Sequence, residues 1–275
     1  MAKTTIAFQG ERGSFSEEAA HLLMGKQITV QPCETFGAIY ESVAAGKTKY
    51  CLAPIENTLA GPVYENYDLL LSNDLHIVGE ARLRIVHNLI ALPGTALKDV
   101  TRVYSHPVAL AQCEKFFKRR PKVERIPFYD TAGAVKMLAE RRPSGAAAIA
   151  SSVAARVYHA RILLTHLEDH RENYTRFLLL SGKARVARKA DKVSIVFSTP
   201  NAPGALYKCL SVFALRDIDL TKLESRPLRG RPFEYFFYVD FMGNVKEERC
   251  RNALAHLAEV TSFLRVLGCY ESARR

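Results

Sequence analysis

Short apolar runs alternate with amphipathic stretches through the first 180 residues of the chain. Apolar runs bounded by turn residues predict strands, and apolar residues at helical spacing predict amphipathic helices. Strands are predicted at 6–9, 28–32, 50–54, 77–92, 103–105, 123–127 and 146–150. Helices are predicted at 16–24, 35–45, from 63, 107–117, 131–140 and 152–159, with a loop at 55–62. This order predicts an α/β fold with a largely parallel sheet, built as two lobes around a cleft.

The order of the elements changes towards the C-terminus. Residues 181–192 are mostly small or basic, which is typical of a linker. Beyond them, strands are predicted at 193–198, 218–225, 233–241 and 260–268, with helices at 204–215 and 246–257. This βαββαβ order is the ferredoxin-like arrangement. We therefore expect one domain over residues 1–182 and a second over residues 192–275.

The composition indicates an ordinary soluble protein, with 48% hydrophobic and 24% charged residues among 275. Residues 1–5 lead into the apolar Ile6–Phe8 without a signal-peptide core, and no apolar run approaches the roughly 20 residues of a membrane helix. A cytoplasmic protein is therefore expected, and a periplasmic solute-binding protein is disfavoured. The six cysteines show no CxxC spacing, which favours reduced thiols over disulfides or a zinc site.

The net charge of +11 raises the question of nucleic-acid binding. Much of the excess lies at 118–120, 141–142 and 183–192, without a helix-turn-helix, RNP or zinc-finger pattern. A field that attracts small anionic metabolites explains the charge equally well, so neither nucleic acid nor a membrane is an expected partner.

The most informative stretch is residues 172–178, where Thr175 and Arg176 precede the apolar run Phe177–Leu180. The run predicts a buried strand with two polar side chains at its entrance. A hydroxyl can hydrogen-bond a leaving group, and a guanidinium can hold a carboxylate. Together they suit an elimination from an acidic substrate.

Other polar clusters fall where a predicted strand gives way to a helix or loop. Each has an ordinary alternative as a turn or cap, but together they would point into one cleft. Gly10–Ser16 lacks the spacing of a nucleotide-binding loop, and Ser105-His106-Pro107 belongs to no defensible Ser-His-Asp set. The clusters lie at 10–16, 54–58, 105–113 and 130–131.

With the segments 11–16, 54–58, 105–113, 130–133 and 173–177 in this order, the chain resembles the prephenate dehydratases over nearly its whole length. The resemblance implies a catalytic part like a periplasmic binding protein and a C-terminal ACT domain that binds phenylalanine as a feedback inhibitor. It also implies conversion of prephenate to phenylpyruvate, water and carbon dioxide, without a metal or cofactor. No chorismate mutase segment precedes Ile6, so a monofunctional enzyme is expected.

The resemblance assigns roles to individual residues. It implies Thr175 as the catalytic residue, with Arg176 holding a substrate carboxylate. The other implied substrate-site residues are Asn57, Thr58, Ser105, Gln112 and Thr131. The implied phenylalanine site comprises Asn201, Gly204, Ala205, Leu206, Glu224, Ser225, Arg226 and Pro227, beside Tyr207, which replaces the motif's valine.

Several alternatives remain open at this point. Arogenate dehydratase runs the same elimination on the amino counterpart of prephenate, and a non-catalytic amino-acid sensor could share both domains. A homodimer or homotetramer is expected, because ACT modules commonly pair and exposed edge strands need cover.

Overall fold

The computed structural model describes residues 4–228, 230 and 233–273. The expectation that no export signal is present concerns residues 1–5, of which residues 1–3 lie outside the described part. The chain forms two compact units: residues 1–70 with 81–178, and residues 71–80 with 179–275. The strands β5 (His76–Arg84) and β11 (Tyr174–Ser181) contribute residues to both units. The domain division expected at 182–192 therefore stays a prediction.

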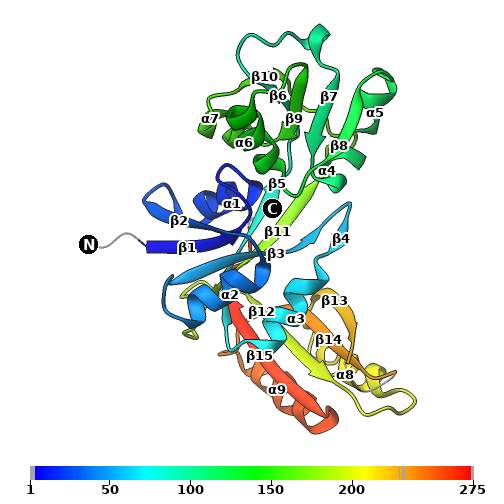
Figure 1. The fold of residues 1–275 in the computed structure, drawn as a ribbon. Helices are drawn as coiled ribbons and strands as arrows, with labels where there is room; N and C mark the ends of the chain where they lie inside the picture. The colour runs from blue at the N-terminus through cyan, green and yellow to red at the C-terminus, as the bar shows by residue number, and fades with distance from the viewer. Residues whose placement is uncertain (1–3, 229, 231–232, 274–275) are drawn as a thin grey trace. The chain divides into compact units, whose positions relative to one another are not determined.

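The first unit begins with a lobe built on a parallel sheet, drawn blue to cyan in Figure 1. Strand β1 pairs in parallel with β2 and with β3, and its residues Ile6 and Phe8 are fully buried. We call this the first lobe. Its strands are β1 (Thr4–Gln9), β2 (Ile28–Cys33), β3 (Tyr50–Asn57) and β4 (Gly61–Pro62), and its helices are α1 (Phe15–Met24), α2 (Phe36–Ala44) and α3 (Tyr64–Ser72).

Residues 88–164 of this unit, which we call the second lobe, have their own sheet in the order β10-β6-β9-β7-β8. Strand β7 is parallel to β8 and β9, whereas β6 is antiparallel to β9 and β10. The strands are β6 (Asn88–Ala91), β7 (Arg102–Ser105), β8 (Glu124–Pro127), β9 (Ala146–Ala150) and β10 (Arg161–Leu164). The helices are α4 (Pro107–Ala111), α5 (Glu114–Lys118), α6 (Thr131–Arg141) and α7 (Ser152–Val157), with a 3-10 turn at Leu97–Asp99.

Strand β9 shows why the second lobe has two apolar layers. All five of its residues are buried, and side chains alternate between the two faces of a strand. Ala147 and Ile149 belong to the cluster with residues of α4 and α5, whereas Ala146, Ala148 and Ala150 belong to the cluster with α6 and α7. The sheet is therefore covered on both faces, as expected of an α/β layer.

Several predicted boundaries differ from the structure. The predicted loop 55–62 is wrong at both ends, because β3 runs to Asn57 and pairs with β4. The predicted helix 107–117 is divided into α4 and α5, since the Gln112 carbonyl accepts from the Asp169 N–H rather than continuing one helix. Strand β10 was not predicted. Its pairing partner, β6, lies far away in the sequence.

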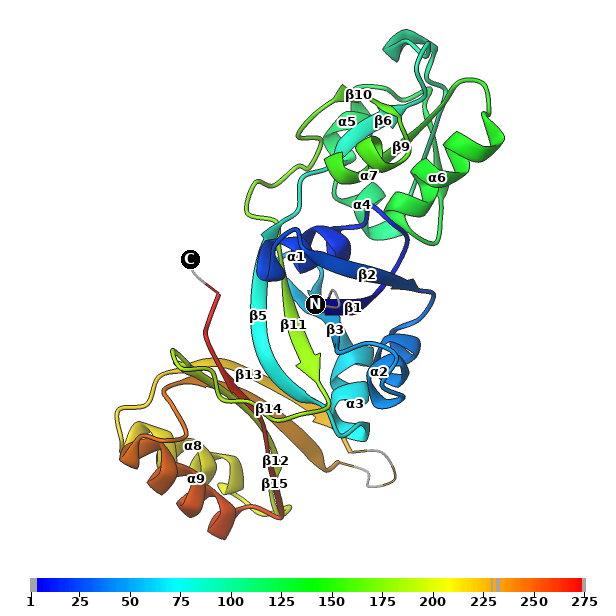
Figure 2. The same cartoon turned by 90° about the vertical axis from the view of Figure 1, so that its left-hand side faces the viewer.

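The second unit confirms the predicted βαββαβ order. Its sheet runs β13-β14-β12-β15-β5, and α8 and α9 lie together on one face (Figure 2). The elements are β12 (Lys192–Ser198), α8 (Ala205–Ala214), β13 (Leu220–Pro227), β14 (Tyr235–Met242), α9 (Glu248–Val260) and β15 (Phe263–Tyr270). The core between helices and sheet includes Ile195, Phe197, Phe213, Phe241 and Leu257.

The segment 71–80 is held in the second unit by a close backbone contact and by polar bonds. Gly268 of β15 pairs with Ile77, and a Cβ at that glycine would lie 2.2 Å from the Ile77 carbonyl oxygen. The Arg265 guanidinium donates to the carbonyl oxygens of Leu71, Asn73 and Leu75 at 3.0–3.3 Å. The segment is therefore an integral part of this unit.

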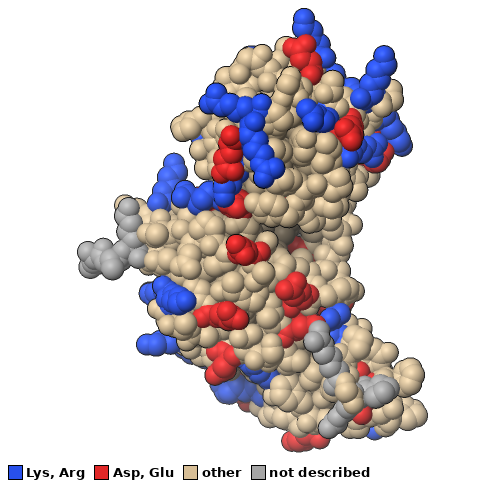
Figure 3. Space-filling view, in the orientation of Figure 1, with Lys and Arg blue, Asp and Glu red and all other residues tan. Residues whose placement is uncertain are grey.

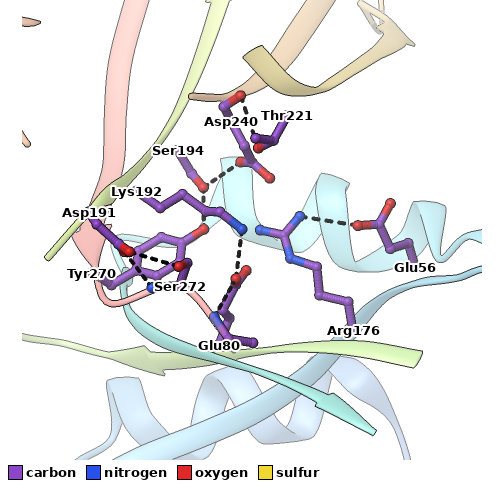
Figure 4. Close-up of polar contacts among 11 residues, drawn as sticks. Glu56, Glu80, Arg176, Asp191, Lys192, Ser194, Thr221, Asp240, Tyr270 and Ser272 are labelled. Atoms are coloured by element: carbon purple, nitrogen blue, oxygen red, sulfur yellow. Dashed lines mark hydrogen bonds and ion pairs between the residues drawn. The ribbon is translucent and has the colours of Figure 1, made fainter. Parts of the chain in front are cut away.

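A buried ion pair completes this attachment (Figure 4). Lys192 Nζ lies 2.6 Å from Glu80 Oε1, and the two side chains are 3% and 0% exposed. Glu80 Oε1 also accepts from the Ala273 N–H at 2.8 Å. Beside them, Ser194 Oγ bonds Asp240 Oδ1 and the Tyr270 hydroxyl at 2.5 and 2.6 Å. Such a pair costs desolvation that only its partners offset.

No helix in the described ranges 4–228 and 233–273 combines the length and apolar character needed to cross a bilayer.

The buried pair gives a stability prediction. Replacing Lys192 with Met should lower the free energy of unfolding by about 3 kcal/mol, because it removes the ammonium that compensates the buried Glu80 charge. Chemical unfolding followed by circular dichroism measures the change. The control Arg249→Met removes an exposed pair with Glu247 and should have a much smaller effect. Equal effects of the two replacements would contradict the prediction.

Candidate active site

The Asn57 side chain, at the end of β3, is fixed by two backbone hydrogen bonds. Its Oδ1 accepts from the backbone N–H groups of Leu59 and Ala60 at 2.9 and 2.8 Å. A backbone N–H can only donate, so the atom that accepts both bonds must be the amide oxygen. The Asn57 Nδ2 group therefore points in the other direction.

A chain of side chains extends from that Nδ2 group. Asn57 Nδ2 donates to Asn173 Oδ1 at 2.8 Å and to Thr175 Oγ1 at 3.0 Å. Asn173 Nδ2 donates to Gln112 Oε1 at 2.9 Å, and His87 Nε2 lies 2.9 Å from the same oxygen. We call these five residues, His87, Gln112, Asn173, Asn57 and Thr175, the amide chain. It joins β3 and the neighbouring strand β11 to Gln112, the C-cap of α4 in the second lobe.

The direction set at Asn57 decides what the amide chain can offer a ligand. Thr175 Oγ1 accepts from Asn57, so its own proton is directed elsewhere, and no contact among the described residues uses it. Gln112 uses its oxygen twice, and its Nε2 has no partner in the described part of the chain. Two hydrogen-bond donors are thus left available, as an anionic ligand or a departing hydroxide requires.

Thr58 is bonded to residues at the start of β11. Its hydroxyl donates to the Glu172 carbonyl at 2.6 Å and accepts from the Tyr174 N–H at 3.0 Å. Its backbone N–H also donates to the Tyr174 carbonyl at 2.9 Å. Thr58 therefore ties β3 to β11 directly beside Asn57 and Thr175, with its hydroxyl proton already used.

Ser105 and Thr131 have no contact with the amide chain among the described bonds. Ser105 is fully buried at the end of β7, and its hydroxyl donates to the Ile149 carbonyl at 2.6 Å. Thr131 is the first residue of α6, directly after the cap Asp130, whose Oδ1 accepts from the Gly133 N–H at 2.6 Å. The capping alternative for Asp130 is confirmed, and burial raises the pKa of its carboxyl.

Arg176 lies on the other face of β11 from its neighbour Thr175, because successive side chains of a strand alternate. Its side chain is 7% exposed, and its guanidinium donates to Glu56 Oε1 at 3.1 Å (Figure 4). The role of Arg176 in holding a substrate carboxylate stays a prediction.

The two lobes touch at a second place, around α1 and α6. Ser151, the cap of α7, donates to the Gly13 carbonyl at 2.6 Å, and a Cβ on Gly13 would lie 2.6 Å from Ala154 Cα. Lys136 of α6 forms an ion pair with Glu11 at 3.0 Å, and the Tyr129 hydroxyl donates to Glu11 Oε1 at 2.9 Å.

On the face drawn in Figure 3, Lys and Arg side chains are concentrated on the second lobe.

The expected effector residues lie on two elements of the second unit. Asn201 and Gly204 precede α8, whose first residues are Ala205 and Leu206. Glu224, Ser225, Arg226 and Pro227 form the end of β13, the edge strand of this sheet. Tyr207 is 76% exposed on α8.

Sequence reasoning missed Asn173 and His87. Asn173 stands two residues before Thr175, and residues i and i+2 of an extended chain share a face, so the strand period could have indicated it. His87 is an isolated histidine between Val86 and Asn88, with no motif around it. Only its packing reveals it: it is 2% exposed and makes an edge-on contact with the Phe15 ring at 5.6 Å.

Comparisons with known proteins identify the family. The family model described as prephenate dehydratase matches residues 6–185. The chain is 44% identical to arogenate dehydratase/prephenate dehydratase 2, chloroplastic, of Arabidopsis thaliana, over 98% of this chain and 73% of that protein. It is 33% identical to a prephenate dehydratase from Arthrobacter aurescens solved in complex with L-Phe, with a TM-score of 0.89 over 98% and 90% of the two chains. It is also 33% identical to GqqA, described as a novel type of quorum-quenching acylase, with a TM-score of 0.90 over 98% of each chain.

The burial of His87 predicts a dependence of stability on pH. Burial lowers the pKa of His87, although the Gln112 hydrogen bond and the Glu168 charge oppose the shift. Between the lowered pKa and the ordinary value of about 6.5, the unfolded chain binds a proton that the folded chain does not. The contribution to stability is therefore complete above about pH 6.5 and is lost as the pH falls through this window.

The free energy of unfolding should thus fall between about pH 7.5 and about pH 5.5, and it should fall less in His87→Gln than in the unchanged protein. Chemical unfolding at both pH values gives the comparison. Burial also lowers the pKa of His106. His106 and the other titratable residues are present in both proteins, so their contributions to the pH dependence cancel in the comparison. Identical pH dependence in both would show that His87 does not titrate in this way.

Proposed function

This chain belongs to the prephenate dehydratase family of hydro-lyases, and from that membership we propose that it converts prephenate to phenylpyruvate. The observation that supports this most directly is the orientation of the amide chain. Two anchored donors, the Thr175 hydroxyl and the Gln112 amide, remain available to a ligand. An acidic substrate that expels hydroxide requires donors of this kind.

The proposed reaction needs little covalent help from the protein. The bond between the ring and its carboxylate breaks, and its electron pair enters the ring. The carbon–oxygen bond to the ring hydroxyl breaks, and the departing hydroxide takes up a proton. The products are phenylpyruvate, carbon dioxide and water. Since the ring becomes aromatic, the enzyme chiefly positions the substrate and stabilises the leaving oxygen.

Thr175 is assigned to the leaving oxygen. Its hydroxyl is too weakly acidic to act as a strong acid at neutral pH, so it donates a hydrogen bond to the departing group. The Gln112 Nε2 group is assigned to a substrate oxygen, and Asn57 holds Thr175 with its proton directed to the ligand. Thr58 braces β3 against β11, and Ser105 and Thr131 shape the second lobe. Arg176 supports β11 through its ion pair with Glu56 and stays the proposed partner of a substrate carboxylate.

Arogenate remains the alternative substrate, because the Arabidopsis relative is named for both dehydratases. Arogenate differs from prephenate by an ammonium in place of a keto oxygen. The available donors of the amide chain suit an acceptor such as the keto oxygen, which favours prephenate.

An acylase function, as described for GqqA, has less support in the geometry of this site. A serine acylase needs a hydroxyl that a base can activate. Ser105, which precedes His106, is fully buried and donates to a backbone carbonyl.

We further propose that the second unit is an ACT domain that binds phenylalanine near the start of α8 and β13. The L-Phe complex of the Arthrobacter enzyme and the matched motifs support this. The edge strand β13 favours pairing with a second copy in a homodimer or homotetramer. All six cysteines are free, which is consistent with a cytoplasmic location.

The first test is turnover of purified protein on prephenate, arogenate and an N-acyl amide. Prephenate should give the highest kcat/KM, and Thr175→Ala should lower kcat by about 10²-fold or more with little change in KM. Thr175→Ser keeps the hydroxyl and should retain most of the rate. Unchanged kcat in Thr175→Ala would overturn the assignment of Thr175, and faster turnover of either other substrate would overturn the choice of prephenate.

The effector proposal is tested by calorimetry with L-phenylalanine. Binding should be measurable in the unchanged protein and weakened by Glu224→Ala, because an amino-acid ammonium needs an anionic partner. The control Glu259→Ala lies on α9, outside the proposed effector site, and should bind normally. Absence of heat with the unchanged protein would remove phenylalanine as the effector.

A further inference from the structure

His87 has two nitrogens in different situations. Its Nε2 lies 2.9 Å from Gln112 Oε1, whereas its Nδ1 is buried without a hydrogen-bond partner among the described residues. The residue is 2% exposed. A buried acceptor without a partner lowers stability, which an apolar side chain of similar size would avoid. Packing alone therefore does not explain a histidine here.

The amide chain decides which nitrogen carries the proton. The N–H groups of Leu59 and Ala60 fix the Asn57 oxygen, so Asn57 Nδ2 donates to Asn173 Oδ1. The Asn173 Nδ2 group must then donate to Gln112, so the Gln112 atom at the junction is its oxygen. An oxygen acceptor requires a donor, and His87 must present Nε2–H to it. Neutral His87 is therefore protonated on Nε2 and bare on Nδ1.

The backbone of His87 is held where the chain crosses between the two lobes. One crossing, residues 85–87, joins β5 to β6, and the other, residues 165–173, joins β10 to β11. The His87 N–H donates to Glu168 Oε2 and its carbonyl accepts from Leu167, both at 2.9 Å. The Ile85 N–H donates to the Asn173 carbonyl at 2.7 Å. Backbone hydrogen bonds thus join the two crossings near His87 and near Asn173, the two residues that contact Gln112.

We propose that His87 is a positioning residue of the dehydratase: its Nε2–H fixes the Gln112 amide and, through Asn173 and Asn57, keeps the Thr175 hydroxyl directed at the substrate. This inference rests on the proposed function, in which Gln112 and Thr175 meet the substrate. Without the imidazole donor, the Gln112 amide loses one of two bonds that hold its oxygen. It can then rotate, and a small loss of alignment at a reacting group costs rate steeply.

The test compares His87→Leu with the conservative His87→Gln, whose amide N–H can replace Nε2–H. His87→Leu should lower kcat on prephenate by about 10-fold or more while changing KM by less than about 3-fold. It should not lower the melting temperature, since it removes the unsatisfied Nδ1. His87→Gln should keep kcat within about 3-fold of the unchanged enzyme. His21→Leu, on α1 and outside the amide chain, is the control.

A spectroscopic measurement separates this inference from the proposed function. In protein labelled with ¹⁵N-histidine, the signals absent from His87→Gln belong to His87. They should show a protonated Nε2 and a bare Nδ1 at neutral pH. A protonated Nδ1, or a His87→Gln enzyme as slow as His87→Leu, would overturn the inference. If the unchanged protein failed to turn over prephenate, the proposed function would fail, while the nitrogen signals would still decide the state of His87.

Discussion

The pair of hydrogen bonds from Leu59 and Ala60 to Asn57 Oδ1 is the constraint on which the site depends. A side-chain amide can turn over at little cost, exchanging its donor and acceptor ends, unless something fixes it. Two backbone donors in the turn after β3 do so here. Every amide downstream then has only one orientation that satisfies its neighbour. The availability of the Thr175 proton is therefore settled by backbone groups that lie outside any catalytic motif.

The fold brings this turn to its partners through strand pairing. Asn57 ends β3, and β11 lies next to β3 in the sheet, so Asn57 meets Asn173 and Thr175 despite a separation of more than 100 residues. The bonds of Thr58 to Glu172 and Tyr174 hold the same two strands together. Gln112 joins from the C-terminal end of α4, where the helix is broken and its carbonyl accepts from Asp169. The apolar periodicity did not predict this break, which positions Gln112 at the end of α4.

Most of the architecture could be predicted from the sequence, because apolar periodicity reports burial locally. The parts that could not be predicted depend on contacts between distant residues. Strand β10 needs the distant strand β6 as its partner, and His87, whose Nδ1 has no partner among the described residues, packs against the distant Phe15. Hydrogen bonds join Asn57, Gln112 and Thr175 through Asn173, whereas Ser105 is bonded to Ile149 and Arg176 to Glu56. Thr175 and Arg176 are adjacent in the sequence, and successive side chains of a strand point to opposite faces.

The site uses neutral amides next to Thr175, and there is a physical reason for this. A carboxylate only accepts hydrogen bonds and an ammonium only donates them. Neither can accept a bond from one neighbour and donate one to the next, as a side-chain amide does. A carboxylate beside Thr175 would also repel both an anionic substrate and the hydroxide that leaves it. The charged pair Arg176–Glu56 lies on the other face of β11, and the Lys192–Glu80 pair lies in the second unit. The ion pairs therefore lie apart from the amide chain. Each buried group can satisfy its hydrogen bonds without changing the orientation of the amides.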